Sequence, residues 1–363
     1  MARRVLFVAS IGATLRLFVA PIARSLRDEG IESIAAAGNL EGQLAGFDRT
    51  YELPSFRRGS AVAVLRAYRC LRAIAVSETP DLLHLHTPPA LVLGRLAARS
   101  LGIPSVAVAH GSFLEPWGAR SVLYATLEST LCRLSAATIT ENDEDARFYR
   151  RFAHAGTVAV APVGGVGIDL KRVEAAKIEP LSLGSSPSIV VVGRLTREKN
   201  LDLIVRAFQE VRASRPNAGL TFVGSPLPGD KAWRVPNEAG ISHTPWAEDP
   251  YPIIAGADLL VLASRREGFS MAAAEALLLG VPVVAVNNRG VRQLIRHHVR
   301  GLSVVGNNSS EMATAIEHAL RLASKVEQDE RLGASWSTKA AVGFHRSVVL
   351  RTISTSVGLE SHK

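Results

Sequence analysis

Residues 266–282 read Arg266-Glu267-Gly268-Phe269-Ser270-Met271-Ala272-Ala273-Ala274-Glu275-Ala276-Leu277-Leu278-Leu279-Gly280-Val281-Pro282. Ser270 suits a helix N-cap, and the glycine and proline near the end stop a helix, so a short helix is predicted at about 271–279. Glu275 is the charged residue of this otherwise apolar helix. A carboxylate there loses water, which costs several kcal/mol unless hydrogen-bond donors replace it. Ligand hydroxyls would supply donors, but so would a neighbouring helix end or a buried arginine.

The segments that flank this helix read as strands. Residues 257–264 and 281–286 are both runs of mostly apolar residues typical of fully buried parallel strands. Glu267 therefore follows the carboxyl end of a strand, where ligands bind in open α/β sheets. The helix amino terminus beside it offers free N–H groups to an anion. The region thus predicts acceptors for sugar hydroxyls and donors for a phosphate in one place.

Glu267, the seven residues after it and Glu275 resemble the donor-binding signature of the retaining glycosyltransferases of family 4. This resemblance implies an α/β protein with the GT-B fold, in which two doubly wound Rossmann-like domains face each other across a cleft. It implies that Glu275 binds the ribose hydroxyls of a nucleotide and that Glu267 contacts the transferred sugar. The backbone amides of Gly268, Phe269 and Ser270 would lie near the diphosphate, although many members have glycine where this chain has Ser270.

The chain of 363 residues is longer than one hydrophobic core usually supports, so two domains are expected. Apolar strands alternate with helical stretches in both halves. We expect an acceptor-binding Rossmann-like domain at 1–168, a proline-containing linker at 169–188 and a nucleotide-sugar-binding domain at 189–334. The resemblance implies that a last helix, at about 335–357, packs back on the first domain.

Composition favours a cytoplasmic enzyme. The two cysteines, Cys70 and Cys132, lie far apart without a partner motif, which argues against a disulfide framework or a zinc site. No apolar run reaches the roughly 20 residues of a membrane span, and the start of the chain reads as a first strand. We expect no cofactor, because a nucleotide sugar would be a substrate.

The net charge of +9 is spread over both halves, but arginines cluster between Glu52 and Glu78, where no acid occurs. The cluster comprises Arg57, Arg58, Arg66, Arg69 and Arg72. The last three share a helix face among apolar residues, which suits an anionic bilayer or pyrophosphate groups and would place the protein on the inner face of the cell membrane. A solvated helix face explains the pattern equally well. Nucleic acid is not expected, because no nucleic-acid motif accompanies the charge.

A basic loop follows the predicted strand at 189–192. Gly193, Arg194 and Lys199 come together at this strand end, where two cations could neutralise a diphosphate leaving group in place of a metal. A solvated loop is the alternative. The resemblance implies that Arg194 and Lys199 hold the donor phosphates, whereas Arg197 has no assigned role. We expect no metal, because no Asp-x-Asp follows a strand.

The first half offers a glycine and three histidines. Gly12 lies in the turn after the first strand, where it could approach a donor phosphate or simply form a tight turn. His110 ends the strand at 106–109, and the family's His-Gly at this place implies that His110 contacts the donor sugar. His86 is expected near the cleft rim, close to the acceptor, and His84 is expected to be partly structural. Their spacing permits metal binding, but no third ligand is evident.

Segments 109–113, 165–169 and 289–295 look most like bacterial transferases that build capsule, exopolysaccharide or O-antigen units on lipid carriers. Gln293 replaces the acid usual in the last segment. We therefore expect a retaining, metal-independent transferase that moves a hexose or N-acetylhexosamine from a nucleotide diphosphate sugar, with uridine as the expected nucleoside, to a lipid-linked saccharide. Its catalytic residues would be His110, Glu267, Arg194 and Lys199.

Three alternatives stay open at this point. The acceptor could be a small soluble natural product, or the protein could be a nucleotide-sugar epimerase of the same fold. It could also bind a nucleotide sugar without catalysis, although both glutamates and both cations are present.

Overall fold

The structure, a computed structural model, describes residues 3–40, 42–56, 60–111, 119–226, 230–322 and 330–360. The chain forms two compact units: unit 1 contains Met1–Gly167 and Thr338–Lys363, and unit 2 contains Ile168–Ser337. Unit 1 is therefore built from both ends of the chain, and unit 2 is one continuous segment.

The described strands of unit 1 form a parallel sheet in the order β3-β2-β1-β4-β5-β6-β7. They are β1 (Arg3–Ala9), β2 (Ile31–Ala37), β3 (Arg49–Glu52), β4 (Leu82–His86), β5 (Ser105–Ala109), β6 (Ala137–Thr140) and β7 (Val158–Val160). The order reverses between β1 and β4. In open α/β sheets, the loops that follow the two strands at such a reversal form the usual ligand site.

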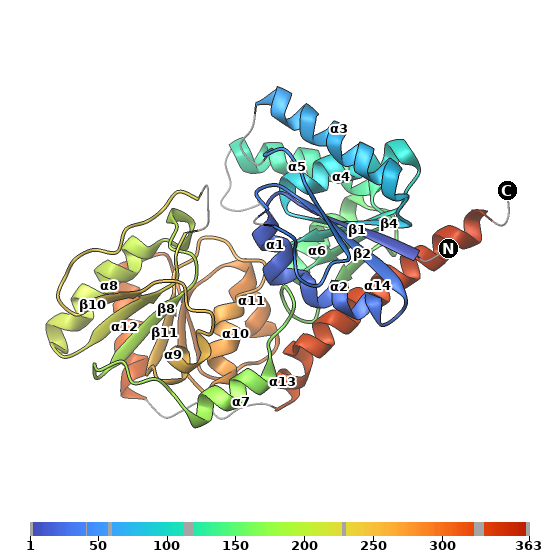
Figure 1. The fold of residues 1–363 in the computed structure, drawn as a ribbon. Coiled ribbons are helices and arrows are strands. Elements are labelled where there is room, and N and C mark those ends of the chain that lie inside the picture. The colour runs from blue at the N-terminus through green and yellow to red at the C-terminus, as the bar shows by residue number, and fades with distance from the viewer. Residues whose placement is uncertain are drawn as a thin grey trace. The chain divides into compact units, whose positions relative to one another are not determined.

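Helices cover both faces of this sheet (Figure 1). They are α1 (Gly12–Phe18), α2 (Ala20–Arg27), α3 (Ala61–Glu78), α4 (Pro88–Leu101), α5 (Ala119–Leu131), the 3-10 turn η1 (Cys132–Leu134), α6 (Asp143–Phe152) and α14 (Thr338–Glu360). Because side chains alternate along a strand, Leu6 and Val8 of β1 pack in a core with α3 and α4. Val5 and Phe7 pack on the other face, in a core with α1, α2 and α14.

Unit 2 repeats the arrangement with a parallel sheet in the order β10-β9-β8-β11-β12-β13. Its strands are β8 (Ser188–Val192), β9 (Gly219–Val223), β10 (Ile241–Thr244), β11 (Leu259–Leu262), β12 (Val283–Val286) and β13 (Leu302–Val305). Its helices are α7 (Leu170–Ile178), η2 (Arg197–Lys199), α8 (Leu201–Ser214), α9 (Tyr251–Ala255), α10 (Met271–Leu278), α11 (Arg289–Arg296), α12 (Ser309–Arg321) and α13 (Glu330–Trp336). The prediction of two doubly wound Rossmann-like domains is confirmed.

Two local features differ from the sequence pattern. Segment 169–188, which reads as a linker, begins with helix α7, because Asp169 caps it by accepting a hydrogen bond from the Lys171 amide at 3.0 Å. The last helical region is split between α13 and α14. Ser337 forms an isolated parallel bridge with Ile168, and this pairing interrupts the helix.

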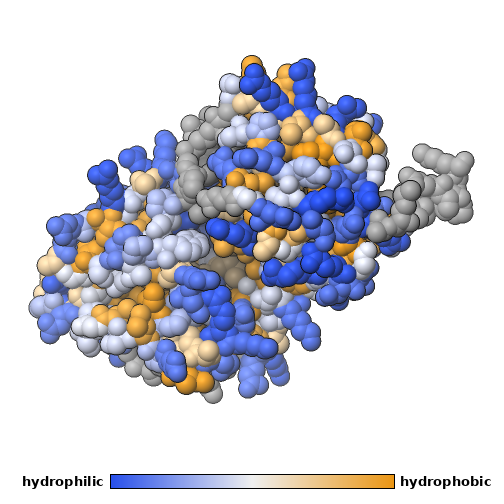
Figure 2. Space-filling view, viewed as in Figure 1, coloured by the Kyte–Doolittle hydropathy of each residue, from blue (hydrophilic) through white to orange (hydrophobic). Residues whose placement is uncertain are grey.

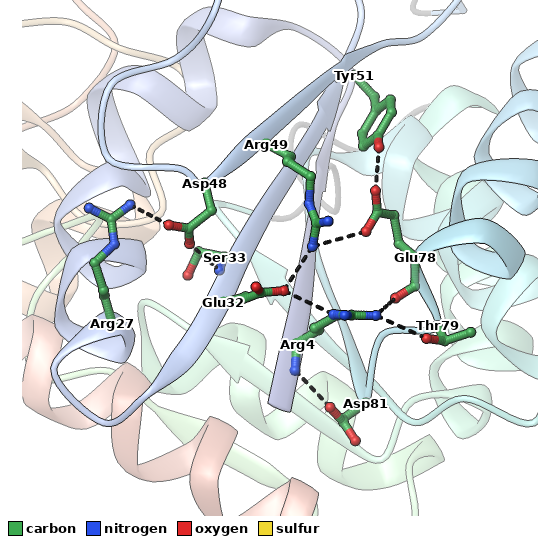
Figure 3. Close-up of polar contacts among 10 residues, drawn as sticks. All are labelled: Arg4, Arg27, Glu32, Ser33, Asp48, Arg49, Tyr51, Glu78, Thr79 and Asp81. Carbon is green, nitrogen blue, oxygen red and sulfur yellow. Dashed lines mark hydrogen bonds and ion pairs between the residues drawn. The ribbon is translucent and has the colours of Figure 1, made fainter. Parts of the chain in front are cut away.

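An ion-pair network joins the amino ends of β1, β2 and β3 (Figure 3). Glu32 Oε2 lies 2.9 Å from Arg4 Nε and 2.8 Å from an Arg49 guanidinium nitrogen. The same Arg49 nitrogen lies 3.1 Å from Glu78 Oε2 at the end of α3, and Tyr51 donates a hydrogen bond to the other Glu78 oxygen. That hydrogen bond raises the pKa of Tyr51. Charges at this end of the sheet therefore meet partners within the protein.

Candidate active site

The carboxyl ends of β8 and β11 bring together two residues that the sequence singles out. Lys199 ends η2, which follows β8, and Glu267 lies in the loop between β11 and α10. Lys199 Nζ is 2.6 Å from Glu267 Oε1, and both side chains are about one-fifth exposed, at 22% and 18%. The pair lies at the point where the strand order of the second sheet reverses, which is the usual place for a ligand.

Glycines allow the loops around this pair to approach closely. Gly193 has a φ of 139°, and a Cβ added to Gly224 would lie 2.1 Å from the Gly193 carbonyl oxygen. A Cβ added to Gly290 would lie 2.7 Å from Glu267 Cβ. A larger residue at Gly224 or Gly290 would push these loops apart. The position of Glu267 therefore depends on Gly290, which the sequence pattern does not single out.

Arg194 belongs to the same region but has its own carboxylate partner. An Arg194 guanidinium nitrogen lies 3.1 Å from Asp230 Oδ2, and the Asp230 side chain is only 5% exposed. A small hollow is lined by Gly193, Arg194, Lys199 and Ser264, among others. The two predicted cations thus border one hollow, whereas Asp230 carries no sequence signal because it lies outside any recognisable motif.

Glu275 projects from α10 and is half-buried. Its hydrogen-bond partner is the Tyr251 hydroxyl, at a long 3.4 Å from Oε1, and among the described residues no ion pair reaches it. Burial raises the pKa of Glu275 to about 7, and Tyr251 and Arg172 only partly oppose the effect. The carboxylate therefore has too few donors within the protein. The sequence left open a buried arginine as the partner of Glu275. Among the described residues, no such arginine is found.

The amino terminus of α10 lies beside Glu267 in the chain. Ser270 occupies the N-cap position, as predicted, but its side chain makes no capping hydrogen bond. Its buried Oγ has no partner among the residues that the structure describes. Phe269 is buried and packs edge-on against Trp336, with ring centroids 5.8 Å apart. Phe269 therefore anchors the turn of Gly268 and Ser270 to the core.

In unit 1, Gly12 begins α1 after the first strand. Its amide donates to the Gly38 carbonyl at 2.8 Å, and an added Cβ would lie 2.6 Å from Leu40 Cδ2. Close loop packing thus accounts for this glycine without a ligand. Directly after the neighbouring strand β4, Thr87 accepts a hydrogen bond from the Ser10 amide at 3.0 Å. Thr87 has a φ of 73°, which is strained for a β-branched residue, and such strain is concentrated at functional sites.

His110 follows β5 and pairs with a residue that follows the next strand. His110 Nδ1 lies 2.7 Å from Glu141 Oε1, which also accepts a hydrogen bond from the Gly165 amide at 2.9 Å. Glu141 directly follows β6, the neighbour of β5. Glu141 is a site residue not expected from the sequence, although it carries the signal that identifies His110, a polar residue directly after a parallel strand.

The expectation that His86 lies near a rim and meets an acceptor is wrong, because the His86 side chain is completely buried. His86 Nδ1 lies 2.9 Å from His110 Nε2, and His86 Nε2 lies 2.8 Å from His84 Nδ1. Burial lowers the pKa of both His84 and His86 well below the ordinary value, so both rings are uncharged at neutral pH. The cause is position: β4 is central in the sheet, and helices cover both of its faces.

Arg66, Arg69 and Arg72 are exposed on α3, as the sequence predicts. Val62, Leu65 and Val76 on the same helix are also exposed, at 58%, 47% and 55%. Arg57 and Arg58 lie outside the described residues. Within the described chain, no helix combines the length and the apolar character that crossing a membrane requires.

Comparison with protein families identifies both halves of the chain. Residues 17–166 match the model described as Glycosyltransferase Family 4, and residues 186–321 match the model described as Glycosyl transferases group 1. The chain is 26% identical over 355 residues to EpsD of Bacillus subtilis strain 168, which is named as a glycosyltransferase. That alignment covers 91% of this chain and 92% of EpsD.

Solved structures share the fold. Anabaena HepE in complex with UDP-glucose has a TM-score of 0.65 and 17% identity, with 99% of this chain and 100% of HepE covered. Sucrose-phosphate synthase from Thermosynechococcus elongatus has a TM-score of 0.75 and 15% identity, with 97% of this chain and 100% of the synthase covered. At these identities the likeness shows the shared fold, which is the GT-B fold expected from the sequence.

Proposed function

We propose that this chain, which belongs to the glycosyltransferases of family 4, moves a hexose or N-acetylhexosamine from a uridine diphosphate sugar to a lipid-linked saccharide in bacterial cell-surface polysaccharide synthesis. The transfer retains the anomeric configuration and uses no metal. The observation that carries the proposal is the carboxylate of Glu275, which is desolvated on an apolar helix and has one distant donor among the described residues.

The ribose of the donor supplies what Glu275 lacks. Two vicinal hydroxyls can donate to one carboxylate, and hydrogen bonds to a charged group contribute about 1.5 to 3 kcal/mol each. Binding would offset the desolvation of Glu275 and favour its ionised form. The UDP-glucose in the HepE structure supports a uridine donor for a protein of this fold.

Lys199, Arg194 and the start of α10 supply positive charge for the diphosphate. The Lys199 ammonium has three donors, so it can hold Glu267 and a phosphate oxygen at the same time. The unpaired Ser270 hydroxyl offers one more donor beside the helix amino terminus. Fixed cations of this kind stabilise the negative charge that develops on the leaving group.

Glu267 contacts the transferred sugar, and Lys199 holds it in place for that contact. The acceptor hydroxyl attacks from the face that the diphosphate leaves, and a leaving-phosphate oxygen takes its proton. The protein then contributes positioning and charge stabilisation, without a side-chain nucleophile.

The exposed face of α3 supports a lipid-linked acceptor. Orange and blue side chains lie next to one another in Figure 2, along the part of unit 1 where Figure 1 places α3. Arg66, Arg69 and Arg72 can bind anionic headgroups while Val62 and Leu65 enter the interface. A soluble acceptor would give this mixture of side chains no role.

Mass spectrometry of the purified protein with a panel of nucleotide sugars tests the proposal. A lipid-linked saccharide, a soluble acceptor or no acceptor is added in parallel reactions. Transfer to the lipid-linked saccharide supports the proposal. Transfer only to the soluble compound would identify the alternative acceptor, isomerised donor without an acceptor would identify an epimerase, and binding without turnover would identify a binding protein.

Flotation with vesicles that contain anionic lipid tests the membrane part separately. Changing Arg66, Arg69 and Arg72 to glutamine should reduce recovery with the vesicles, since each arginine near the surface contributes about 1 kcal/mol. A variant with glutamine at Arg147, Arg150 and Arg351, which are exposed elsewhere in unit 1, removes the same charge and should float like the wild type. An equal loss of vesicle binding in both variants would mean that the net charge of the protein, and not the exposed face of α3, causes the binding.

A further inference from the structure

A row of three imidazole rings links the core of unit 1 to the end of β5. His84 Nδ1 is 2.8 Å from His86 Nε2, His86 Nδ1 is 2.9 Å from His110 Nε2, and His110 Nδ1 is 2.7 Å from Glu141 Oε1. His84 and His86 have no exposed surface, whereas the His110 side chain is 24% exposed. The row therefore has one end in the core and the other at the partly exposed carboxyl end of β5.

Glu141 determines where the proton lies on every ring. The Gly165 amide can only donate, so Glu141 Oε1 is an acceptor, and it accepts from His110 Nδ1–H. A neutral His110 then has a lone pair at Nε2, which requires His86 to donate from Nδ1. His86 Nε2 is consequently an acceptor, and His84 must donate from Nδ1. All three rings carry the proton on Nδ1 and donate toward Glu141.

The opposite direction fails at the Glu141 end of the row. For a neutral His110 it requires a Glu141 oxygen that donates, whereas the Gly165 amide already shows that oxygen to be an acceptor. The other end does not distinguish the directions, because the buried His84 Nε2 has no partner in the described chain, and an unpaired lone pair there costs about as much as an unpaired N–H. A proton added at His110 Nε2 would likewise oppose His86 Nδ1–H.

Packing prevents the buried rings from turning to relieve such a conflict. The ring of Phe7 lies 5.1 Å from His84 and 6.5 Å from His86, centroid to centroid, on the face that α14 covers. The rings of His86 and His110 lie nearly in one plane, edge to edge, with centroids 5.2 Å apart and an interplanar angle of 19°. A flip of the His86 ring would break two hydrogen bonds and a flip of the His84 ring would break one, and both would need space that this core does not provide.

We propose that His84 and His86 are positioning residues that hold His110 in a single uncharged tautomer, with both ring nitrogens already occupied. His110 then meets the sugar as a fixed neutral ring beside the Glu141 carboxylate, and it does not exchange a proton with the substrate. A neutral ring suits a sugar that becomes positively charged in the transition state of glycosyl transfer. The role of His110 at the sugar rests on the proposed transferase function, but the expected tautomers of the free protein do not rest on it.

Nitrogen NMR of the free protein with labelled histidine tests the tautomers without any substrate. The chain has ten histidines, and the loss of signals in His110→Asn, His86→Phe and His84→Phe assigns the three rings. We expect protonated Nδ1 and unprotonated Nε2 on all three. A proton on Nε2 of His86 or His110, or a mixture of tautomers, would overturn the proposal even if the protein proves to be a transferase.

Kinetics of a matched pair tests the positioning role. His86→Phe keeps an aromatic ring and removes both nitrogens, so kcat should fall about tenfold, the equivalent of one hydrogen bond, with the donor KM nearly unchanged. His86→Gln can still accept from His84 and donate to His110, and it should retain most of the activity. Equal kcat in wild type and His86→Phe would contradict the role. If His86→Phe does not fold, the tautomers of the wild type still decide the proposal.

Discussion

The two units have nearly the same amino ends but different carboxyl ends in their sheets. In unit 1, the Asp81 carboxylate accepts from the Arg4 amide at 2.7 Å, and the Asp81 amide donates to the Arg4 carbonyl at 2.9 Å. In unit 2, Asp258 and Ser188 form the same two hydrogen bonds, also at 2.7 and 2.9 Å. Each pair joins the two strands at which the strand order reverses.

At the carboxyl ends, by contrast, unit 1 has the row of His84, His86 and His110 that ends at Glu141, and unit 2 has the ion pair of Lys199 with Glu267. The shared end closes a strand pair with short local hydrogen bonds, which any doubly wound unit needs. The differing end carries the residues that we propose to meet the substrate. Stability and chemistry are thus assigned to opposite ends of the same strands.

The strongest expected effect is at the carboxyl end of unit 2. Lys199→Ala removes the cation that holds Glu267 and faces the leaving phosphate, so turnover should fall about 100- to 1,000-fold, as for the loss of one transition-state donor. Thermal unfolding should change little, because the Lys199 side chain is partly exposed. Steady-state kinetics and a melting curve measure both quantities.

Arg197→Ala is the control for that variant, because Arg197 is exposed two residues away in the same turn. It should retain near-normal turnover. A similar loss in both variants would assign the effect to the net charge of the loop.

Activity that disappears in a chelator and returns with magnesium would contradict the metal-free mechanism.

Changes at the amino ends of the sheets should have the opposite effect to Lys199→Ala. They should lower stability and leave turnover unchanged. Asp81→Ala and Asp258→Ala each leave a backbone amide without its charged acceptor, so each should lower the free energy of unfolding by about 1.5 to 3 kcal/mol. The activity of the remaining folded protein should be unchanged. Urea unfolding and kinetics at low temperature measure the two effects, and a loss of turnover without a loss of stability would disprove the division between the ends.

The smallest effect concerns pH. The pKa of Glu275 is raised to about 7 from an ordinary 4.5. Folding therefore favours its protonated form, and this stabilising contribution is present below about pH 4.5 and is lost as the pH rises through about 7. Glu275→Gln, which cannot ionise, should lose less stability than the wild type between about pH 5 and about pH 8.

Nucleotide binding should depend on pH in the opposite direction to stability. Ribose hydroxyls favour the ionised carboxylate, so the affinity of the wild type for uridine should rise, up to about tenfold, over the same pH range. Uridine avoids the titration of a phosphate. Calorimetry on Glu275→Gln should show weaker binding without this trend. An affinity that is equal in both proteins would make Glu275 structural.

Local patterns were sufficient for the fold and for part of the site. Helix α10 could be predicted because its cap and its glycine–proline end lie within one stretch of chain. Lys199 and Glu267 follow buried strands, so their approach could be inferred from the rule for parallel sheets. These predictions depend on short-range sequence and on one topological regularity.

The remaining site residues depend on contacts between distant segments. Tyr251 meets Glu275, and Asp230 meets Arg194, across parts of the chain whose relative placement no periodicity reveals. His86 was misplaced because a histidine near a strand end reads as accessible, and only the packing of β4 between helices shows that it is buried.

The return of α14 to unit 1 has a consequence for synthesis. Val348, Val349 and Ile353 of this helix lie in the same core as Val5 and Phe7 of the first strand. A ribosome makes the first strand before unit 2 and α14 after it, with all of unit 2 between them. Domains fold as units while the chain emerges. The core of unit 1 therefore stays incomplete until α14 is made, although the synthesis of unit 1 begins first. Unit 2, whose synthesis begins second, has its whole sequence made before unit 1 is complete.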